Sequence, residues 1–295
     1  MRSTWARLLQ VAILLLVAGS AQAATFACSL GTVPNYTQIY SDVSNSSTAL
    51  SVTVSCTKSG GGGGLTFDYT VIPNNGLNPS GAQNRATGAA GNINYDLYTD
   101  SSCTIPWSGA GTFSFAGGKG GATISQTLNY FGCVPAAQPG FPSAGSSTDL
   151  VSMTLAIVTT GAITVTGTNP QSFNVTINVN PRCTFSTPPG TVNFGTYTAF
   201  QGSANLANTT FSTTCTNLTP YTLSLDANSG AVSGLNYSLL LNTTSSGGVH
   251  PFGPVPGTGS AQTYYINGTM PANQAGTCAG ASCAGTNVHT LTVTY

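Results

Sequence analysis

Charge is scarce in this sequence, and glutamate is absent altogether. The 295 residues include six lysines and arginines and six aspartates, so charged residues make up only 4% of the chain. A chain without a basic cluster has little to attract nucleic acid or an anionic membrane surface, and we expect neither as a partner. Without glutamate, a paired-carboxylate catalytic site would have to be assembled from scattered aspartates.

Motifs of the common catalytic and cofactor sites are also absent. There is no G-x-S-x-G sequence, and the run Gly60–Gly64 is not followed by the Lys-Ser/Thr pair of a phosphate loop, so we interpret it as a flexible connection. A zinc site at Cys278, Cys283 and His289 is a weak alternative, because no CxxC pair accompanies these residues. We therefore expect a protein that is not an enzyme and that holds no metal and no other cofactor.

The longest apolar run lies at the beginning of the chain. Residues 1–23 combine Arg2 and Arg7, an apolar run from Leu8 to Ala18 and the small-residue sequence Ala21-Gln22-Ala23. This is the order of features in a secretory signal peptide. The apolar run is too short to span a bilayer and no later run is longer, so we expect an exported chain without a membrane span after cleavage.

Eight cysteines follow this segment, an even number in an exported chain, where disulfides form and persist. Closing a loop of about thirty residues contributes roughly 3 to 4 kcal/mol in the chain-entropy model. Sequence alone leaves the connectivity open among many pairings. The preferred pairs are Cys28–Cys56, Cys103–Cys133, Cys183–Cys215 and Cys278–Cys283.

Threonine, serine, asparagine, glycine and β-branched residues are abundant, which favours strands and turns over helices. Apolar and polar residues alternate in both halves, which is the pattern of strands with one buried face. Strands are predicted in the first half at 50–56, 65–71, 93–97, 124–130 and 151–157. They are predicted in the second half at 192–197, 211–215, 221–227, 235–242, 262–268 and 289–295. We expect an all-β chain with two antiparallel β-sandwich domains in tandem.

Several motifs of the second half follow one another in order. Cys183 is followed by V-x-F-G-x-Y at 192–197, by Cys215, by an N-Y-x-L strand at 236–239 and by T-L-T-V-T-Y at 290–295. This combination resembles the spore coat protein U domain, which forms the subunits of Csu-type, or archaic, chaperone-usher pili. The resemblance covers nearly the whole second half.

The first half resembles the same domain in fewer features. It has Cys28, Cys56, the sequence INYDLYTD at 93–100 and the ending DLVSMTLAIV at 149–158. It lacks F-G-x-Y after its first cysteine and carries inserted glycine-rich loops. Two such domains in one chain resemble a tip adhesin whose first domain meets the surface.

The resemblance implies immunoglobulin-like sandwiches that lack their last strand. In such pilins the neighbouring subunit supplies the strand from a segment before its first cysteine, by strand addition to an open sheet edge. Here only Ala24–Ala27 lie between the expected cleavage site and Cys28, whereas a groove-filling strand needs about 8 to 10 residues at about 3.3 Å each. We therefore expect a subunit that accepts a strand but does not donate one, at the distal end of the fibre.

One further alternating segment lies between the halves. Its apolar face consists of Phe173, Val175, Ile177 and Val179. We hypothesise that it, with Ile163 and Val165, completes or abuts the first domain within the same chain and leaves the C-terminal domain open. The alternative is an ordinary first strand of the second domain. The expected division is a signal peptide at 1–23, an adhesin-like domain at 24–160, a linker and in-cis donor strand at 161–182, and a pilin-like domain at 183–295.

Two sets of site residues follow from this interpretation. The acceptor groove is expected at Val192, Phe194, Leu291, Val293 and Tyr295, which in a closed sandwich would be ordinary core residues. Surface-binding loops are expected at Ile105, Pro106, Trp107, Phe113, Phe115, Val134 and Phe141. Apolar residues on loop tips form the kind of patch that mediates interactions. Alternatively, Trp107 and Phe115 plug the end of the core, and the strand parity of Phe113 and Phe115 allows an inward direction.

The expected function is that of a pilus tip subunit which mediates adhesion to abiotic or host surfaces and biofilm formation. Its expected partners are a periplasmic chaperone, an outer-membrane usher and a stalk pilin. It would be secreted through the periplasm to the cell surface. Two alternatives remain, a structural coat or envelope protein with closed domains, and a glycan-binding module that uses Tyr and Asn side chains in the same loops.

Overall fold

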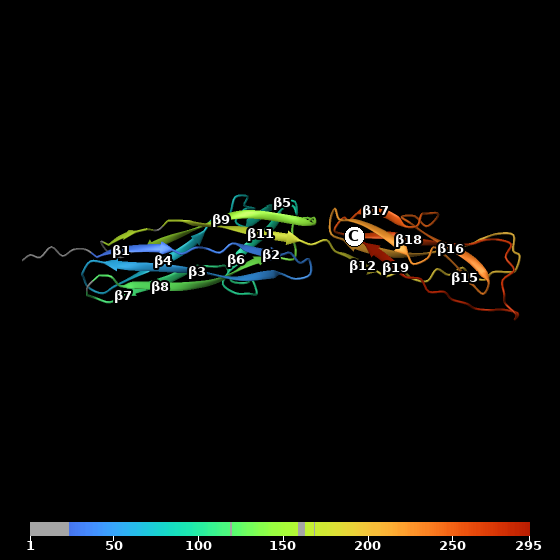
Figure 1. Ribbon diagram of the computed structural model, residues 1–295, viewed down its shortest axis with the longest axis horizontal. Helices are drawn as coiled ribbons and strands as arrows, with labels where there is room; N and C mark the ends of the chain where they lie inside the picture. Colours follow the sequence, from blue (N-terminus) through green and yellow to red (C-terminus); the bar gives the residue numbers. More distant parts are fainter. Residues whose placement is uncertain (1–23, 119, 159–162, 168) are drawn as a thin grey trace, which may run out of the picture.

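The computed structural model describes residues 24–118, 120–158, 163–167 and 169–295, and these residues form strands and loops without a helix. The expected signal peptide at 1–23 lies outside the described residues. Figure 1 shows two β-rich bodies arranged end to end along one axis. We call the part up to Val179 the first body and the part from Cys183 the second body. The prediction of an all-β chain in two units is confirmed.

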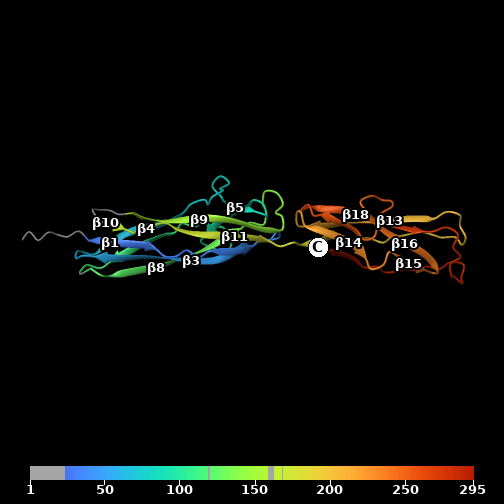
Figure 2. The same ribbon diagram turned by 45° about the horizontal axis from the view of Figure 1, so that its top comes forward.

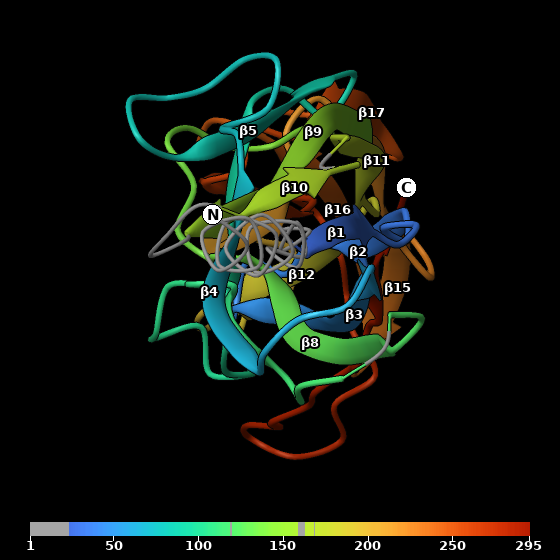
Figure 3. The same ribbon diagram turned by 90° about the vertical axis from the view of Figure 1, so that its left-hand side faces the viewer.

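The first body has two layers of strands. One layer contains, in spatial order, β10 (Thr164–Thr166), β1 (Thr25–Leu30), β3 (Ser46–Ser59), β8 (Thr123–Val134) and β6 (Ile93–Tyr98). The other contains β7 (Ala110–Phe115), β4 (Leu65–Pro73), β9 (Gly145–Val158), β11 (Gln171–Val179) and β2 (Tyr36–Ile39). The short strand β5 (Asn84–Gly88) pairs with both β6 and β9 and joins the layers at one side. Seen along the long axis, β9 and β11 lie on the opposite side from β3 and β8 (Figure 3).

The second body repeats this arrangement with fewer strands. One layer contains β12 (Cys183–Thr187), β13 (Asn205–Cys215), β18 (Ala261–Met270), β16 (Leu235–Asn242) and β15 (Ser229–Val232). The other contains β17 (Phe252–Pro256), β14 (Pro220–Leu225) and β19 (Leu291–Thr294). The order β1-β3-β8-β6 thus corresponds to β12-β13-β18-β16, and the neighbours β4-β9 correspond to β14-β19.

Disulfides mark the same place in both bodies. Cys28 lies directly opposite Cys56 in the register of β1 and β3, and Cys183 lies directly opposite Cys215 in that of β12 and β13. The other two disulfides join Cys103 to Cys133 and Cys278 to Cys283. These are the four pairs preferred from the sequence.

Each body has its own hydrophobic core, because alternate residues of every strand point between the layers. The first core extends from Phe26 to Val179 and includes all four apolar residues of β11. The second extends from Cys183 to Met270. Burial of the β11 side chains therefore stabilises the first body, although this strand leads directly into the second (Figure 2).

One strand expected from the sequence is absent. The segment 192–197 has alternating apolar residues but no strand pairing. Its counterpart β2 is a strand because it pairs with β11, with Tyr36 opposite Val175. A strand needs a neighbour for its backbone groups, and in the described part of the chain this segment has none.

Candidate functional site

The two bodies differ at one sheet edge. In the first body β9 is flanked on one side by β4 and on the other by β11. In the second body the corresponding strand β19 pairs with β14, and no described strand pairs with its other edge. The first body therefore has a neighbouring strand at this edge, and the described part of the second body does not.

The strand β11 shows what fits at this edge. It runs antiparallel to β9 over nine consecutive residue pairs, from Gln171 opposite Met153 to Val179 opposite Gly145. On its other side it runs parallel to β2. Its apolar residues are 0–6% exposed, and the ring centroid of Phe173 lies 6.5 Å from that of Tyr36. A strand in this position closes the sheet and covers the core.

The segment 192–197 takes the place of β2 in the second body. A Cβ atom added at Gly268 of β18 would lie 2.7 Å from atoms of both Phe194 and Val192. In the first body a Cβ at Gly132 of β8 would lie 2.5 Å from Tyr36 in the same way. Both bodies thus use a glycine in one layer to admit an aromatic side chain from the other.

The apolar residues near β19 are incompletely covered. Leu291 and Val293 are half-buried and Tyr295 is 57% exposed, whereas Val151, Met153 and Leu155 on the inward face of β9 are 0–2% exposed. Val192 and Phe194 are also half-buried. We refer to these five residues of the second body, Val192, Phe194, Leu291, Val293 and Tyr295, as the open edge.

A polar network lies just before β19. The hydroxyl of Tyr237 lies 2.6 Å from Nε2 of His289, whose Nδ1 lies 2.8 Å from Oδ1 of Asp226. Asn287 donates an amide hydrogen to the same hydroxyl. The hydrogen bond from His289 is the main cause that holds the pKa of Asp226 below its ordinary value.

The first body has a simpler version of this network. Tyr95 donates its hydroxyl hydrogen to Oδ2 of Asp149 at 2.7 Å, and Val175 of β11 lies opposite Asp149 in the register. Burial raises the pKa of Tyr95 well above its ordinary value, and its hydrogen bond to Asp149 adds to this. The Tyr–Asp pair is thus covered by a strand.

Three of the residues expected on surface-binding loops are in the core, which corrects that prediction. Phe113 and Phe115 are 0% and 3% exposed, because β7 pairs with β4 and directs both rings between the layers. Val134 is 0% exposed at the end of β8. None of the three offers a side chain to an outside surface.

The remaining loop residues do not form one patch. Ile105 and Pro106 are exposed, and Trp107 is half-buried with its ring centroid 4.9 Å from that of Tyr130. Phe141 is 57% exposed but lies beside Gly259 of the second body, at the junction. The expected surface-binding residues that remain exposed therefore lie on separate parts of the molecule.

The glycine-rich loops are held by a lysine whose role the sequence pattern does not indicate. Lys58 is 1% exposed, and its Nζ donates to the carbonyl oxygens of Gly62, Gly63 and Ala116 at 3.2–3.5 Å. Gly62 also forms a β-bridge with Gly118. The loops after β3 and after β7 are therefore tied together by a buried cation, and the glycine run is held rather than free.

Neither a metal cluster nor a membrane-spanning helix is found in the described residues. No group of three or more His, Cys, Asp or Glu side chains is placed to hold a metal ion there. The thiols considered for zinc, Cys278 and Cys283, are joined in a disulfide. No helix among the described residues is long and apolar enough to cross a bilayer.

The fold and the site thus define a tandem β-sandwich protein with one closed and one open sheet edge. The family model of the Spore Coat Protein U domain matches residues 13–154 and 169–294. The chain belongs to this family. A comparison with curated proteins gave no match.

One similar solved structure is the CsuC-CsuE chaperone-tip adhesion subunit pre-assembly complex from archaic chaperone-usher Csu pili of Acinetobacter baumannii. The matched chain is 15% identical to this one, with a TM-score of 0.49, and the match covers 91% of this chain and 100% of that chain. The CupB6 tip adhesin from Pseudomonas aeruginosa is 12% identical, with a TM-score of 0.39 and coverage of 86% and 91%. The CooA pilin subunit from enterotoxigenic Escherichia coli is 15% identical, with a TM-score of 0.32 and coverage of 52% and 98%.

Proposed function

We propose that this chain is the tip subunit of an archaic chaperone-usher pilus, and that a donor strand from the next pilin completes its second body at the open edge. The observation that carries the proposal is the difference between the repeats. The edge of β9 is occupied by β11 of the same chain, whereas that of β19 has no partner in the described residues. An uncovered sheet edge beside apolar side chains is a site for strand addition.

The first body supplies the template for this addition. A donor placed as β11 is placed on β9 would run antiparallel to β19. Tyr295, which follows β19, shares a small cavity with Pro181 at the junction of the bodies, so the donor would run away from the first body. The next pilin would then lie beyond the far end of the second body, with the first body outermost (Figure 1).

The first residues after the expected cleavage site are already used within their own body. Thr25–Leu30 form β1, which pairs with β3 on one side and with β10 on the other. This pairing supports a subunit that accepts a strand without donating one. The pairing of β10 with β1, together with that of β11 with β9, also favours β11 as the in-cis donor strand of the first domain.

An open edge of this kind needs cover before assembly, because unpaired backbone groups and half-buried apolar side chains promote aggregation. A periplasmic chaperone would provide that cover, and an outer-membrane usher would exchange it for the stalk pilin. The subunit would be displayed at the cell surface, where the first body mediates adhesion and biofilm formation. Of the expected contact residues, Ile105, Pro106 and Trp107 retain exposed surface for this role, whereas the exposed Phe141 lies at the junction.

Hydrogen exchange and peptide capture test the donor-strand proposal. Backbone amides of β19 on the edge away from β14 should exchange rapidly, and those of β9 slowly. A synthetic peptide with the sequence of residues 171–180, which contains β11, should bind the chain in a 1:1 complex. It should protect the backbone amides of β19 from exchange. At about 100 times its dissociation constant it should stabilise the second body by about 2.7 kcal/mol.

The matched control is a peptide of the same composition with its apolar and polar positions exchanged, since a shift of one residue turns every side chain to the other face. This control should give no protection. Equal protection of β19 and β9 in the chain without peptide would contradict the proposal, and would favour the closed-domain coat protein.

A further inference from the structure

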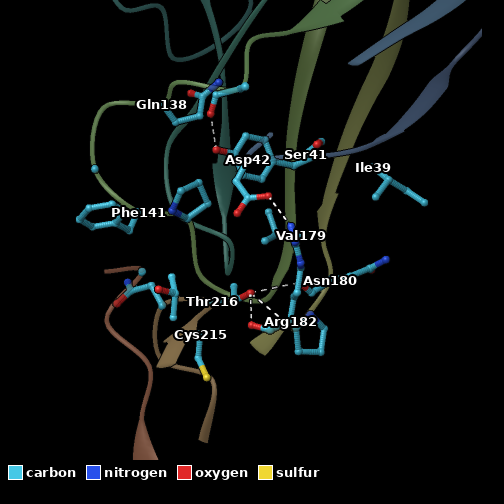
Figure 4. A pocket seen from close by; sticks show the side chains of 18 of the residues that line it. Ile39, Ser41, Asp42, Gln138, Phe141, Val179, Asn180, Arg182, Cys215 and Thr216 are labelled. Atoms are coloured by element: carbon cyan, nitrogen blue, oxygen red, sulfur yellow. Dashed lines mark hydrogen bonds and ion pairs between the residues drawn. The ribbon is translucent and has the colours of Figure 1, made fainter. Parts of the chain in front are cut away.

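A cleft of about 620 Å³ lies at the junction of the two bodies (Figure 4). Its volume falls within the roughly 300–1,000 Å³ typical of small-molecule sites. The first body contributes Tyr40, Asp42 and Phe141 to its wall, and the second contributes Thr216 and Asn217. Sites between two packed units are common places for ligands.

The walls of this cleft are tied to each other. Only Asn180, Pro181 and Arg182 connect β11 to β12. Nη1 of Arg182 lies 2.9 Å from Oδ1 of Asp42, and Asn217 donates to the hydroxyl of Ser143 at 3.1 Å. A short linker and two polar contacts across the junction make this a pre-formed site, which lowers the cost of ordering it around a ligand.

Phe141 provides an apolar platform at one flank of the cleft. Its side chain is 57% exposed, in a protein that buries most of its other phenylalanines. Gly259 of the second body has a φ of +74°, and a Cβ atom there would lie 2.3 Å from Cβ of Phe141. Only glycine allows the second body to come this close, and the loop that carries Phe141 is further held by the bond from the Tyr40 hydroxyl to the Ala136 carbonyl.

The charged groups of the cleft balance one another. The side chains of Asp42 and Arg182 are 63% and 53% exposed and face each other, as Figure 4 shows. An anionic ligand would be repelled by Asp42, and a cationic one by Arg182. A fully apolar ligand would cover both without giving them hydrogen bonds. A neutral ligand with several donors and acceptors fits this set of groups.

We infer that the cleft binds a short neutral saccharide. The apolar face of one sugar ring stacks on Phe141, while hydroxyls of the neighbouring ring donate to the carboxylate of Asp42 and accept from the guanidinium of Arg182. Nothing in this arrangement requires the open edge, which lies on β19 and on the segment 192–197. The inference thus adds a second binding site to the chain and is independent of strand addition.

The test measures binding of maltose, lactose, cellobiose and mannobiose to the full exported chain by ligand-observed NMR and titration calorimetry. At least one of these should bind, and Phe141→Ser should weaken that binding about tenfold, the loss expected for one good stacking contact. Asp42→Asn should also weaken it several-fold. Phe200→Ser is the matched control, because Phe200 is 68% exposed and lies outside the cleft wall, and it should leave the affinity unchanged.

Three results would overturn the inference. These are no binding of any of the four disaccharides, binding that both cleft variants leave intact, and equally tight binding of the acidic sugar sialyllactose. Unchanged melting temperatures of the variants show that any lost affinity reflects the site rather than folding. Peptide capture at β19, measured on the same samples, keeps this test separate from that of the pilus proposal.

Discussion

At the scale of single residues, alternation predicted which side chains are buried more reliably than which are exposed. Phe113 and Phe115 have the parity of a strand, and the pairing of β7 with β4 places both in the core. Flanking glycines suggest that they lie on a loop. Those glycines instead form the turn and allow the loops after β3 and after β7 to approach each other closely. Apolar side chains on short strands between glycines are therefore better assigned to the core.

Lys58 is the residue whose role could not be predicted from sequence, because its partners are backbone carbonyls of two separate loops. Lys58→Met keeps the approximate length of the buried side chain and removes its donors, leaving the carbonyls of Gly63 and Ala116 without these bonds. We expect a loss of roughly 2 to 4 kcal/mol in the free energy of unfolding of the first body, measured in urea.

Arg85, which is half-buried, serves as control for this variant. Its side chain also bonds a backbone carbonyl, that of Asn78, but at the surface. Arg85→Met should change the free energy of unfolding by less than about 0.5 kcal/mol. Equal losses in the free energy of unfolding for the two variants would show that the contribution of the Lys58 hydrogen bonds does not depend on the burial of its side chain.

At the scale of elements, strands could be located from sequence, but their neighbours could not. The segment 173–179 was recognised by its alternation, which is the same whether it joins β9 or a strand of the second body. The segment 192–197 alternates as well, yet forms no strand, because pairing depends on a neighbour and not on the pattern alone. Register and edge occupancy are tertiary properties, and they decide which site is open.

The variant Ile177→Ala tests where β11 belongs energetically. Ile177 is 0% exposed within the first core, so its truncation should cost about 2 to 4 kcal/mol. Hydrogen exchange should become faster in β9 and β2 and stay unchanged in β13 and β18. Asn174→Ala, on the outward face of the same strand, is the control and should have little effect. Loss of protection mainly in the second body would contradict the assignment.

At the scale of the whole molecule, the repetition of cysteine spacing and strand pattern was enough to predict two β units in tandem. The junction between them was not predictable, since its cleft brings together 39–42, 136–142, 179–184, 214–217 and Gly259 from five separate parts of the sequence. The strand β11, which the predicted division places in a linker and in-cis donor strand, packs in the core of the first body.

Fragments provide the corresponding test. Residues 24–182 should give a soluble, cooperatively unfolding protein, whereas 24–160 should aggregate or melt much lower, because removing β11 uncovers Val151 and Met153. Burial of each of the four apolar side chains of β11 contributes about 1.5–3 kcal/mol to the stability of the first body. Circular dichroism melting and size-exclusion chromatography would measure this. Equal stability of the two fragments would mean that β11 is dispensable to the first unit.

The direct continuation of β11 through Asn180, Pro181 and Arg182 into β12 determines how the molecule carries tension. The strand lies alongside β9, close to the long axis of the molecule. A force that pulls the two bodies apart along this axis therefore loads the backbone hydrogen bonds between β11 and β9 in shear. Bonds loaded in this way must break together, not one after another as in a peeled hairpin. The covalent path out of the first unit therefore starts from one of its most firmly anchored strands.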